Sequence, residues 1–155
     1  MTDATAPALE HVFTARVTVA TPLELGQTSA GRRRVIPITG GTVSGPRLQG
    51  QVLAGGADWQ SVLADGTAHL VARYTLLADD GTLISVVNRG VRRGPPEVLA
   101  RLVAGEIVEP SEYYFRAAPS FEVEPGPHDW LARSMFMAVG ERAPDHVVIR
   151  VFEVT

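Results

Sequence analysis

Apolar and polar side chains alternate over long stretches of this chain. From Leu9 to Val19 every second side chain, including His11, falls on a mainly apolar face, and most side chains between them are polar. A period of two is typical of a half-buried strand. The same reasoning predicts strands at 35–39, 47–53, 68–78, 82–88, 112–117, 120–124, 131–139 and 146–154. Residues 1–8 are expected to form a flexible N-terminus ahead of a single domain over 9–155.

Turn and helix signals separate these runs. Asp-Gly at 80–81 lies between two alternating runs, which is the strongest short signal for a hairpin. Two prolines begin the segment 95–105, apolar residues follow at helical spacing and glycine ends it, so one short helix is predicted near 95–104. Residues 21–31 and 124–129 are predicted to be loops, and Pro119 is expected to join two separate strands.

These elements predict a mainly all-β fold. The chain has about eight to ten short predicted strands and no alternation of strands with helices, a pattern typical of an antiparallel sandwich or a closed barrel. Long strands joined by hairpins favour the barrel, because closure removes the exposed edges that a Val- and Ile-rich sheet would otherwise carry. We therefore expect a single antiparallel β-barrel of about eight to ten strands with one short helix.

Composition excludes several classes of chemistry. Arginine supplies all 14 basic residues, so a Schiff-base lysine is excluded, and the chain has no cysteine for a thiolate nucleophile or a thiolate-ligated metal. The four histidines are scattered without metal-ligand spacing, so no metal and no cofactor are expected. A net charge of −3 argues against nucleic acid as a partner. Without an apolar run long enough to span a membrane, and without a signal peptide, the expected location is the cytoplasm, with no membrane contact.

The segment from Gly40 to Gln60 is rich in glycine and contains an acid and an indole, Asp58 and Trp59. Glycine is used where the backbone takes a positive φ or where another group approaches it closely. We therefore expect this segment to line a concave surface and to mark the location of a site.

Several ordered motifs resemble one family of proteins. They are GG-x3-GP-x-L-x-G-x-V-L-x-GG-A-D-W-Q at 40–60, A-R-Y-T-L at 72–76, E-Y-Y-F-R at 112–116, P-x-F-E at 119–122 and W-L-A-R at 130–133. Over nearly the whole chain they resemble the uncharacterised proteins grouped as domain of unknown function 3237. The resemblance implies a small antiparallel β-barrel, often a homo-oligomer, and implies no particular activity.

A barrel of this size encloses room for one small ligand, and its inward polar and aromatic side chains are the candidates for chemistry. The candidate group is Asp58, Trp59, Arg73, Tyr74, Asn88, Tyr114, Arg116 and Trp130. Adjacent strand residues face opposite sides, so only one of Arg73 and Tyr74 faces the interior, and the apolar neighbours favour Tyr74.

Asp58 and Tyr74 are the predicted catalytic residues. Partial burial beside an indole would move the pKa of Asp58 toward a range useful for a general acid or base. Tyr74 would donate a hydrogen bond to a carbonyl or relay a proton. The alternatives are that Asp58 caps a backbone turn and that Tyr74 is an ordinary core residue.

Five further residues are predicted to bind substrate: Trp59, Asn88, Tyr114, Arg116 and Trp130. Asn88 either orients a ligand oxygen or supports the turn toward Gly90. Arg116 either clamps a carboxylate or enolate oxygen or forms a structural salt bridge. Trp130 is either a lid at the barrel mouth or a packed plug, and His128 beside it is the one histidine worth testing for catalysis.

The sequence leaves three functions open. The first is a cofactor-free acid–base enzyme of the isomerase, lyase or cyclase type, acting on an oxygenated, mostly apolar small molecule. The second is a non-catalytic, lipocalin-like barrel that binds an apolar ligand. The third is a structural homo-oligomer whose interior is filled by side chains, which the absence of any cavity above about 300 Å³ would favour. A homo-oligomer, dimeric or larger, is compatible with all three.

Overall fold

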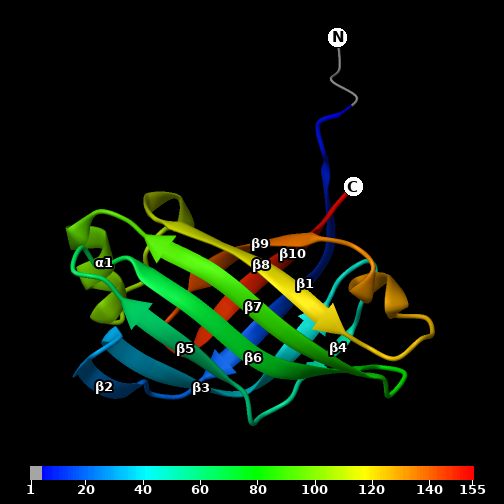
Figure 1. The fold of residues 1–155 in the computed structure, drawn as a ribbon, viewed down its shortest axis with the longest axis horizontal. Coiled ribbons are helices and arrows are strands. Elements are labelled where there is room, and N and C mark those ends of the chain that lie inside the picture. The colour runs from blue at the N-terminus through cyan, green and yellow to red at the C-terminus, as the bar shows by residue number, and fades with distance from the viewer. Residues whose placement is uncertain (1–4) are drawn as a thin grey trace.

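The strands close into an antiparallel barrel (Figure 1), as the sequence predicts. The computed structural model describes residues 5–155. Part of the predicted flexible N-terminus, residues 1–4, lies outside the described residues. Ala8 is held against the C-terminal residue by two hydrogen bonds. Its backbone N–H donates to the carbonyl of Thr155 at 3.0 Å, and its carbonyl accepts from the N–H of Thr155 at 2.9 Å.

Ten strands make up the sheet in the described residues. They are β1 (Leu9–Val19), β2 (Leu23–Thr28), β3 (Gly31–Ser44), β4 (Gly50–Val52), β5 (Ala57–Val62), β6 (Ala68–Ala78), β7 (Leu83–Arg93), β8 (Tyr114–Glu122), β9 (Phe136–Arg142) and β10 (His146–Val154). The helix α1 (Pro96–Val103) and two 3₁₀ turns, Pro110–Glu112 and Asp129–Ala132, complete the fold.

The pairing order explains the closure. Neighbours run β1-β10-β9-β8-β7-β6, and β4 and β5 share the place between β6 and β3. A pairing of β3 with β1 closes a ring of eight strands, to which β4 and β2 are additional. The strand β3 is long enough to pair first with β2 and β5 and then with β1 and β4.

Four expected elements differ from the structure. The predicted loop at 21–31 contains β2, and the glycine-rich segment contains β5, so both strands were missed. Pro119 does not divide β8, which runs without a break through it. The predicted strand at 131–139 begins only at Phe136, because the residues before it form a 3₁₀ turn and its continuation.

The placement of Leu9 and His11 on the buried face of the first strand is wrong, because β1 contains a bulge. The pairing of β1 with β10 shifts register between His11 and Phe13. An extra residue in one strand turns the following side chains to the other face. Leu9 and His11 are therefore exposed, whereas Phe13, Ala15 and Val17 are buried as expected.

The two ends of the barrel differ in their filling. At the end near the 3₁₀ turn Asp129–Ala132, the rings of Phe13, Phe121 and Phe136 pack edge to face, with centroids 5.2 and 5.9 Å apart. Trp130 packs on Phe136 and is covered by the guanidinium of Arg47, 3.8 Å from its ring centroid. The helix α1 lies at the opposite end (Figure 1), and polar side chains enter the interior on that side.

Candidate functional site

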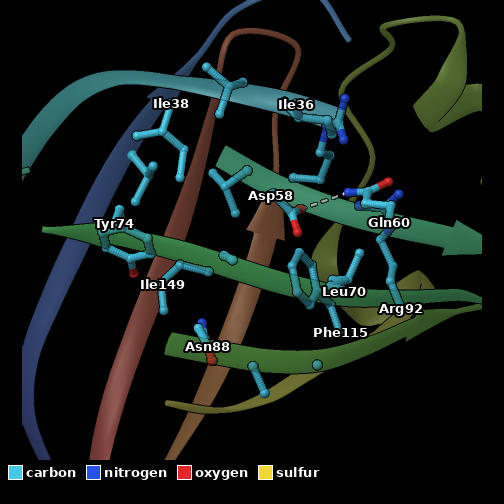
Figure 2. A pocket seen from close by; sticks show the side chains of 17 residues that line it. Ile36, Ile38, Asp58, Gln60, Leu70, Tyr74, Asn88, Arg92, Phe115 and Ile149 are labelled. Carbon is cyan, nitrogen blue, oxygen red and sulfur yellow. Dashed lines mark hydrogen bonds between the residues drawn. The ribbon is translucent and has the colours of Figure 1, made fainter. Parts of the chain in front are cut away.

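Figure 2 shows side chains that line a cavity inside the barrel, on the side toward α1. Its wall is mostly apolar, with Val17, Val19, Ile36, Ile38, Leu70, Ala72, Phe115, Ala117, Val147 and Ile149. Six side chains in the wall carry polar groups: Asp58, Gln60, Tyr74, Asn88, Arg92 and Arg142. The free volume is about 50 Å³, room for a few water molecules or for one end of an organic molecule.

Strand register explains how Asp58, Asn88 and Tyr74 come to share this cavity. Asp58 on β5 pairs with Ala72 on β6, and Ala72 pairs with Asn88 on β7. Two strand spacings put the backbones of Asp58 and Asn88 about 10 Å apart, and the small methyl group of Ala72 leaves the space between them open. Tyr74 lies two residues along β6 from Ala72 and therefore faces the same side.

A hydrogen-bonded chain fixes the carboxyl group of Asp58. Gln60 Nε2 donates to Asp58 Oδ2 at 2.8 Å, and Arg34 Nε donates to Gln60 Oε1 at 2.7 Å. Gln60 is only 1% exposed, so neither bond is open to competition from bulk solvent. Because Oδ2 accepts an N–H, the proton of the neutral acid belongs on Oδ1, which is buried without a hydrogen-bond partner among residues 5–155.

Burial raises the pKa of Asp58 above its ordinary value of 3.8. The hydrogen bond from Gln60 and the charges of Arg92, Arg142 and Arg34 act in the opposite direction. Asp58 as a whole residue is half-buried, but the surroundings of the carboxyl oxygens decide the pKa, and Oδ1 is shielded from solvent. A carboxyl group with a raised pKa is suited to donate and retrieve a proton near neutral pH.

Tyr74 and Asn88 add two neutral polar groups. Burial, followed by the nearby carboxyl of Asp58, raises the pKa of Tyr74, so its hydroxyl keeps its proton and is available as a donor. Asn88 is 6% exposed, and its Oδ1 is buried without a partner among the described residues. Asn88 lies inside β7 and not at a turn, which makes the turn interpretation wrong.

Three arginines gather at the α1 side of Asp58. Arg34 and Arg92 are each 8% exposed, and Arg142 Nε is buried without a partner in the described part of the chain. Burial, followed by the charges of Arg142 and Arg34, lowers the pKa of Arg92 to about 10. Burial also lowers the pKa of Arg142, with Arg34 contributing next. With a pKa of about 10, the guanidinium of Arg92 remains charged at neutral pH.

An outer pocket of about 300 Å³ adjoins the cavity beneath α1. Arg92 and Arg142 line both the inner cavity and the outer pocket, and Arg34 lines the outer pocket. The outer wall is otherwise largely apolar, with Val62, Ala68, Leu99, Leu102 and Val103. The arginines therefore form the neck between an outer pocket and the inner cavity that holds Asp58.

The remaining predicted site residues lie outside the cavity. Trp59 and Tyr114 are 39% and 41% exposed on the outside of the barrel. Arg116 is exposed too, near the ring of Tyr114, and its Nη1 donates to the carbonyl of Phe115 at 3.0 Å. Arg73 faces outward, leaving the interior to Tyr74 as expected. The predicted meeting of Trp59, Tyr114 and Arg116 with Asp58 is wrong, since each side chain alternates to the outer face of its strand.

Trp130 and His128 lie at the far end of the barrel. Trp130 is the packed plug described above and not a lid over the cavity. His128 Nε2 is 2.9 Å from Asp80 Oδ2 in the β6–β7 hairpin, so it contacts none of the cavity residues.

The glycines of the segment 40–60 serve strand packing, whereas Asp58 and Gln60 at its end line the cavity, as expected for a segment that marks the site. A Cβ at Gly41 would lie 2.0 Å from the carbonyl oxygen of Arg16, and one at Gly56 would lie 2.4 Å from that of Arg73. Glycine at these positions lets neighbouring strands approach. Asp58 lies in regular β5 within this segment, so the turn-capping alternative is also wrong.

Sequence reasoning missed Gln60, Arg92, Arg142 and Arg34. A signal for the first two was present, because Gln60 is two residues from Asp58 and Arg92 is four from Asn88, which puts each pair on one strand face. Arg34 lies on β3, which pairs with β5, and Arg142 lies on β9, across the barrel. Both reach the site only through tertiary strand pairing, which local sequence patterns do not specify.

Residues 5–155 contain no group of three His, Asp or Glu side chains arranged to hold a metal ion. No helix in the same range is long and apolar enough to cross a membrane.

Known proteins resemble this chain over nearly its full length. A family model described as protein of unknown function (DUF3237) matches residues 7–154. A UPF0311 protein of Clostridium acetobutylicum is 39% identical over 147 residues, covering 94% of this chain and 93% of that protein. The crystal structure of a conserved protein of unknown function from Rhodopseudomonas palustris has 38% identity and a TM-score of 0.95, covering 98% of this chain and 100% of the other.

A more distant relative has a name that states a reaction. The hydroalkoxylation enzyme phnH of Penicillium herquei is 34% identical over 84 residues, which cover 54% of this chain and 56% of that enzyme.

Proposed function

The chain belongs to the DUF3237 family, and on that premise we propose that its barrel is a cofactor-free acid–base enzyme acting on carbon–oxygen bonds. The reaction class is the addition of an O–H group across a carbon–carbon double bond, or the reverse elimination. The observation that carries the proposal is the buried, oriented carboxyl of Asp58 in the wall of a mostly apolar cavity. The partial similarity to a hydroalkoxylation enzyme supports the same class.

Asp58 begins the cycle as a neutral acid. Its Oδ1 proton passes to one carbon of the double bond, whose π electrons form the new C–H bond. A lone pair of the substrate hydroxyl forms the C–O bond to the other carbon. The hydroxyl proton then passes to the Asp58 carboxylate, which restores the acid and balances the reaction.

The surrounding groups favour this cycle. The charges of Arg34, Arg92 and Arg142 lower the pKa of Asp58 and therefore stabilise the carboxylate that exists between the two proton transfers. Tyr74 donates a hydrogen bond to an oxygen of the substrate, and Asn88 accepts or donates one from the other side of Ala72. The apolar wall excludes water that would otherwise compete with the hydroxyl as nucleophile.

The size of the cavity limits how a substrate binds. The interior alone is below the criterion of about 300 Å³ and by itself favours the filled, structural barrel, so the proposed enzyme needs the outer pocket as well. About 50 Å³ holds only the reacting end, whereas typical ligand pockets begin near about 300 Å³, the volume of the outer pocket. The substrate body therefore occupies the outer pocket beneath α1, and its alkene end passes the arginine neck. Side chains of the cavity wall shift to bring this end against Asp58.

Deuterium incorporation tests the proposal. The protein is incubated in D₂O with ortho-alkenyl phenols, and the cyclic ether is expected to carry one deuterium on carbon, detected by mass spectrometry and NMR. Asp58→Asn keeps the shape and the acceptor for Gln60 but cannot donate the proton, so the rate should fall about 10²–10⁴-fold. Asp79→Asn, an exposed acid in the β6–β7 hairpin, is the matched control.

Two results would count against the proposal. Turnover that survives Asp58→Asn removes Asp58 from the chemistry. Phenols that bind to the wild-type protein and emerge without deuterium and without ring closure indicate the non-catalytic ligand-binding barrel instead.

A further inference from the structure

The arginine neck carries more positive charge than the surrounding residues balance. Arg34, Arg92 and Arg142 face one buried carboxyl, that of Asp58, and Arg34 also lies 3.6 Å from Glu24, whose side chain is 47% exposed. Burying an unpaired charge is costly, and such charges are normally paired. The neck therefore has at least one positive charge that no buried group of the described chain neutralises.

Arg92 is the clearest case. No hydrogen bond or ion pair joins its guanidinium to any residue between 5 and 155, and its only aromatic contact is with Phe115, 5.7 Å from the ring centroid. Arg142 adds a buried Nε that has no partner within the same range, while its backbone N–H donates to Tyr113 Oη at 2.8 Å and holds the strand in place. Both side chains line the inner cavity and the outer pocket together.

We propose that Arg92 and Arg142, supported by Arg34, bind a planar oxyanion group of an organic ligand, such as a carboxylate, at the neck between the two spaces. This inference rests on the proposed function and specifies its substrate class. A guanidinium offers parallel N–H donors that match the two oxygens of a carboxylate. The apolar walls on both sides of the neck accept the rest of an aromatic or aliphatic molecule, so the substrate is an apolar organic acid with an alkene.

The fixed position of Arg34 supports this assignment of roles. Its Nε is engaged by Gln60 and one of its terminal nitrogens faces Glu24, so its orientation is set before a ligand arrives. Arg92 and Arg142 have their donors available. Anion binding there would also offset the positive charges that lower the pKa of Asp58, so the acid would be more fully protonated in the complex.

Calorimetry with a matched pair of probes tests the oxyanion site. The ligands are 2-naphthoate and the neutral 2-naphthalenemethanol, which differ in the carboxylate alone. Wild-type protein should bind the carboxylate about tenfold or more tightly than the alcohol, the effect of a hydrogen bond to a charged group. Arg92→Gln and, separately, Arg142→Gln should weaken naphthoate binding by a similar factor and leave the alcohol within about threefold.

Arg33→Gln is the matched control, because Arg33 lies on β3 beside Arg34 but faces the other side of the strand. It should leave both affinities within about twofold. Inorganic phosphate should compete poorly with naphthoate, since it lacks the apolar body. Equal affinity for the two naphthyl probes, equal losses in Arg33→Gln and Arg92→Gln, or phosphate binding tighter than naphthoate would each overturn the inference.

The two proposals fail in different ways. If naphthoate binding depends on Arg92 but no alkenyl phenol or alkenyl acid incorporates deuterium, the oxyanion site stands and the catalytic proposal fails. If neutral substrates turn over and the arginine variants bind naphthoate normally, the catalytic proposal stands and the oxyanion site fails. Asp58→Asn should still bind naphthoate, because the change leaves all three arginines of the neck in place.

Discussion

The two oxygens of Asp58 have different surroundings, and this asymmetry gives the residue a defined proton position. Oδ2 accepts a hydrogen bond from Gln60, whereas Oδ1 is buried and no group of the described residues bonds to it. The same burial that makes the carboxyl useful as an acid makes its charged form unfavourable in the folded protein. Asp58 is therefore expected to lower the free energy of unfolding at pH values at which its carboxyl is ionised.

The pH dependence of stability tests this expectation. The folded-state pKa of Asp58 is raised above the ordinary 3.8, so between the two values the folded protein holds more protons than the unfolded chain. Stability falls as pH rises through that window. Asp58→Asn cannot ionise, so its melting temperature relative to wild type should rise through the same window and show no such gain below pH 3.8. A gain that does not depend on pH, or one shared by Asp79→Asn, would contradict the burial argument.

Gln60 is a positioning residue, because it acts through Asp58. Gln60→Leu leaves Oδ2 of Asp58 and Nε of Arg34 without their partner, and each orphaned buried group costs about 1–3 kcal/mol. We expect lower stability in urea unfolding, and a pH–rate profile whose limb for Asp58 moves to higher pH because a hydrogen bond that lowers its pKa is gone. A lower rate with an unchanged pH profile would show that Gln60 supports the structure alone.

At the residue scale, the sequence predicted part of the site. Asp58, Tyr74 and Asn88 share one face of three successive strands, and strand alternation is readable from the sequence for β6 and β7. Trp59 was assigned by chemical type in a segment not recognised as a strand, and Tyr114 and Arg116 were assigned to one face of the predicted strand 112–117, which proves to be the outer face. The arginine neck was beyond reach, because its members come from β3, β7 and β9 and meet only when the barrel closes.

At the scale of elements, the strand β3 shows how the sequence builds closure. Gly40 and Gly41 lie where β3 turns from its pairing with β5 to its pairing with β1, and both have positive φ, +151° and +142°. Of these two glycines, only Gly41 has neighbouring backbone where a Cβ would lie, because that Cβ would be 2.0 Å from the carbonyl oxygen of Arg16. A Cβ at Gly40 would meet nothing closer than 3.7 Å.

Paired substitutions separate backbone strain from this close approach. Gly40→Ala and Gly41→Ala carry nearly the same cost of placing alanine at positive φ. Only Gly41→Ala must also push β1 away from β3, which adds roughly 1–3 kcal/mol of overpacking. Urea unfolding of the two variants should show that difference. Equal destabilisation would mean that the β1–β3 seam accommodates a methyl group.

The success of the element predictions followed the strength of the local signals. The hairpin of β6 and β7 and the helix α1 were predicted because Asp-Gly, Pro-Pro and a closing glycine mark their limits. The strand β2 was missed because all but one of its residues are exposed, so no buried face imposes alternation on its sequence. The strand β5 was hidden among glycines whose role is to let strands approach, which resembles a loop in composition alone.

At the scale of the whole molecule, the barrel divides stability and chemistry between its ends. The end beyond Phe136 is filled by aromatic rings and plugged by Trp130, whereas the α1 end buries the carboxyl and three arginines beside open space. Packed aromatic rings stabilise a fold, and buried charges lower its stability while serving a function. The two ends should therefore respond to substitution with opposite sign.

Two truncations compare the ends directly. Trp130→Ala removes the plug and its contacts with Phe136 and Arg47, so unfolding free energy should fall by roughly 2–4 kcal/mol while naphthoate affinity of the folded protein is unchanged. Arg92→Gln removes a buried charge that two other arginines repel, so stability should hold or rise while naphthoate affinity falls. Urea unfolding and calorimetry on the same two variants measure both quantities. If Trp130→Ala weakened ligand binding as much as Arg92→Gln, the plug would have to be coupled to the cavity, and the division between a structural end and a functional end would be wrong.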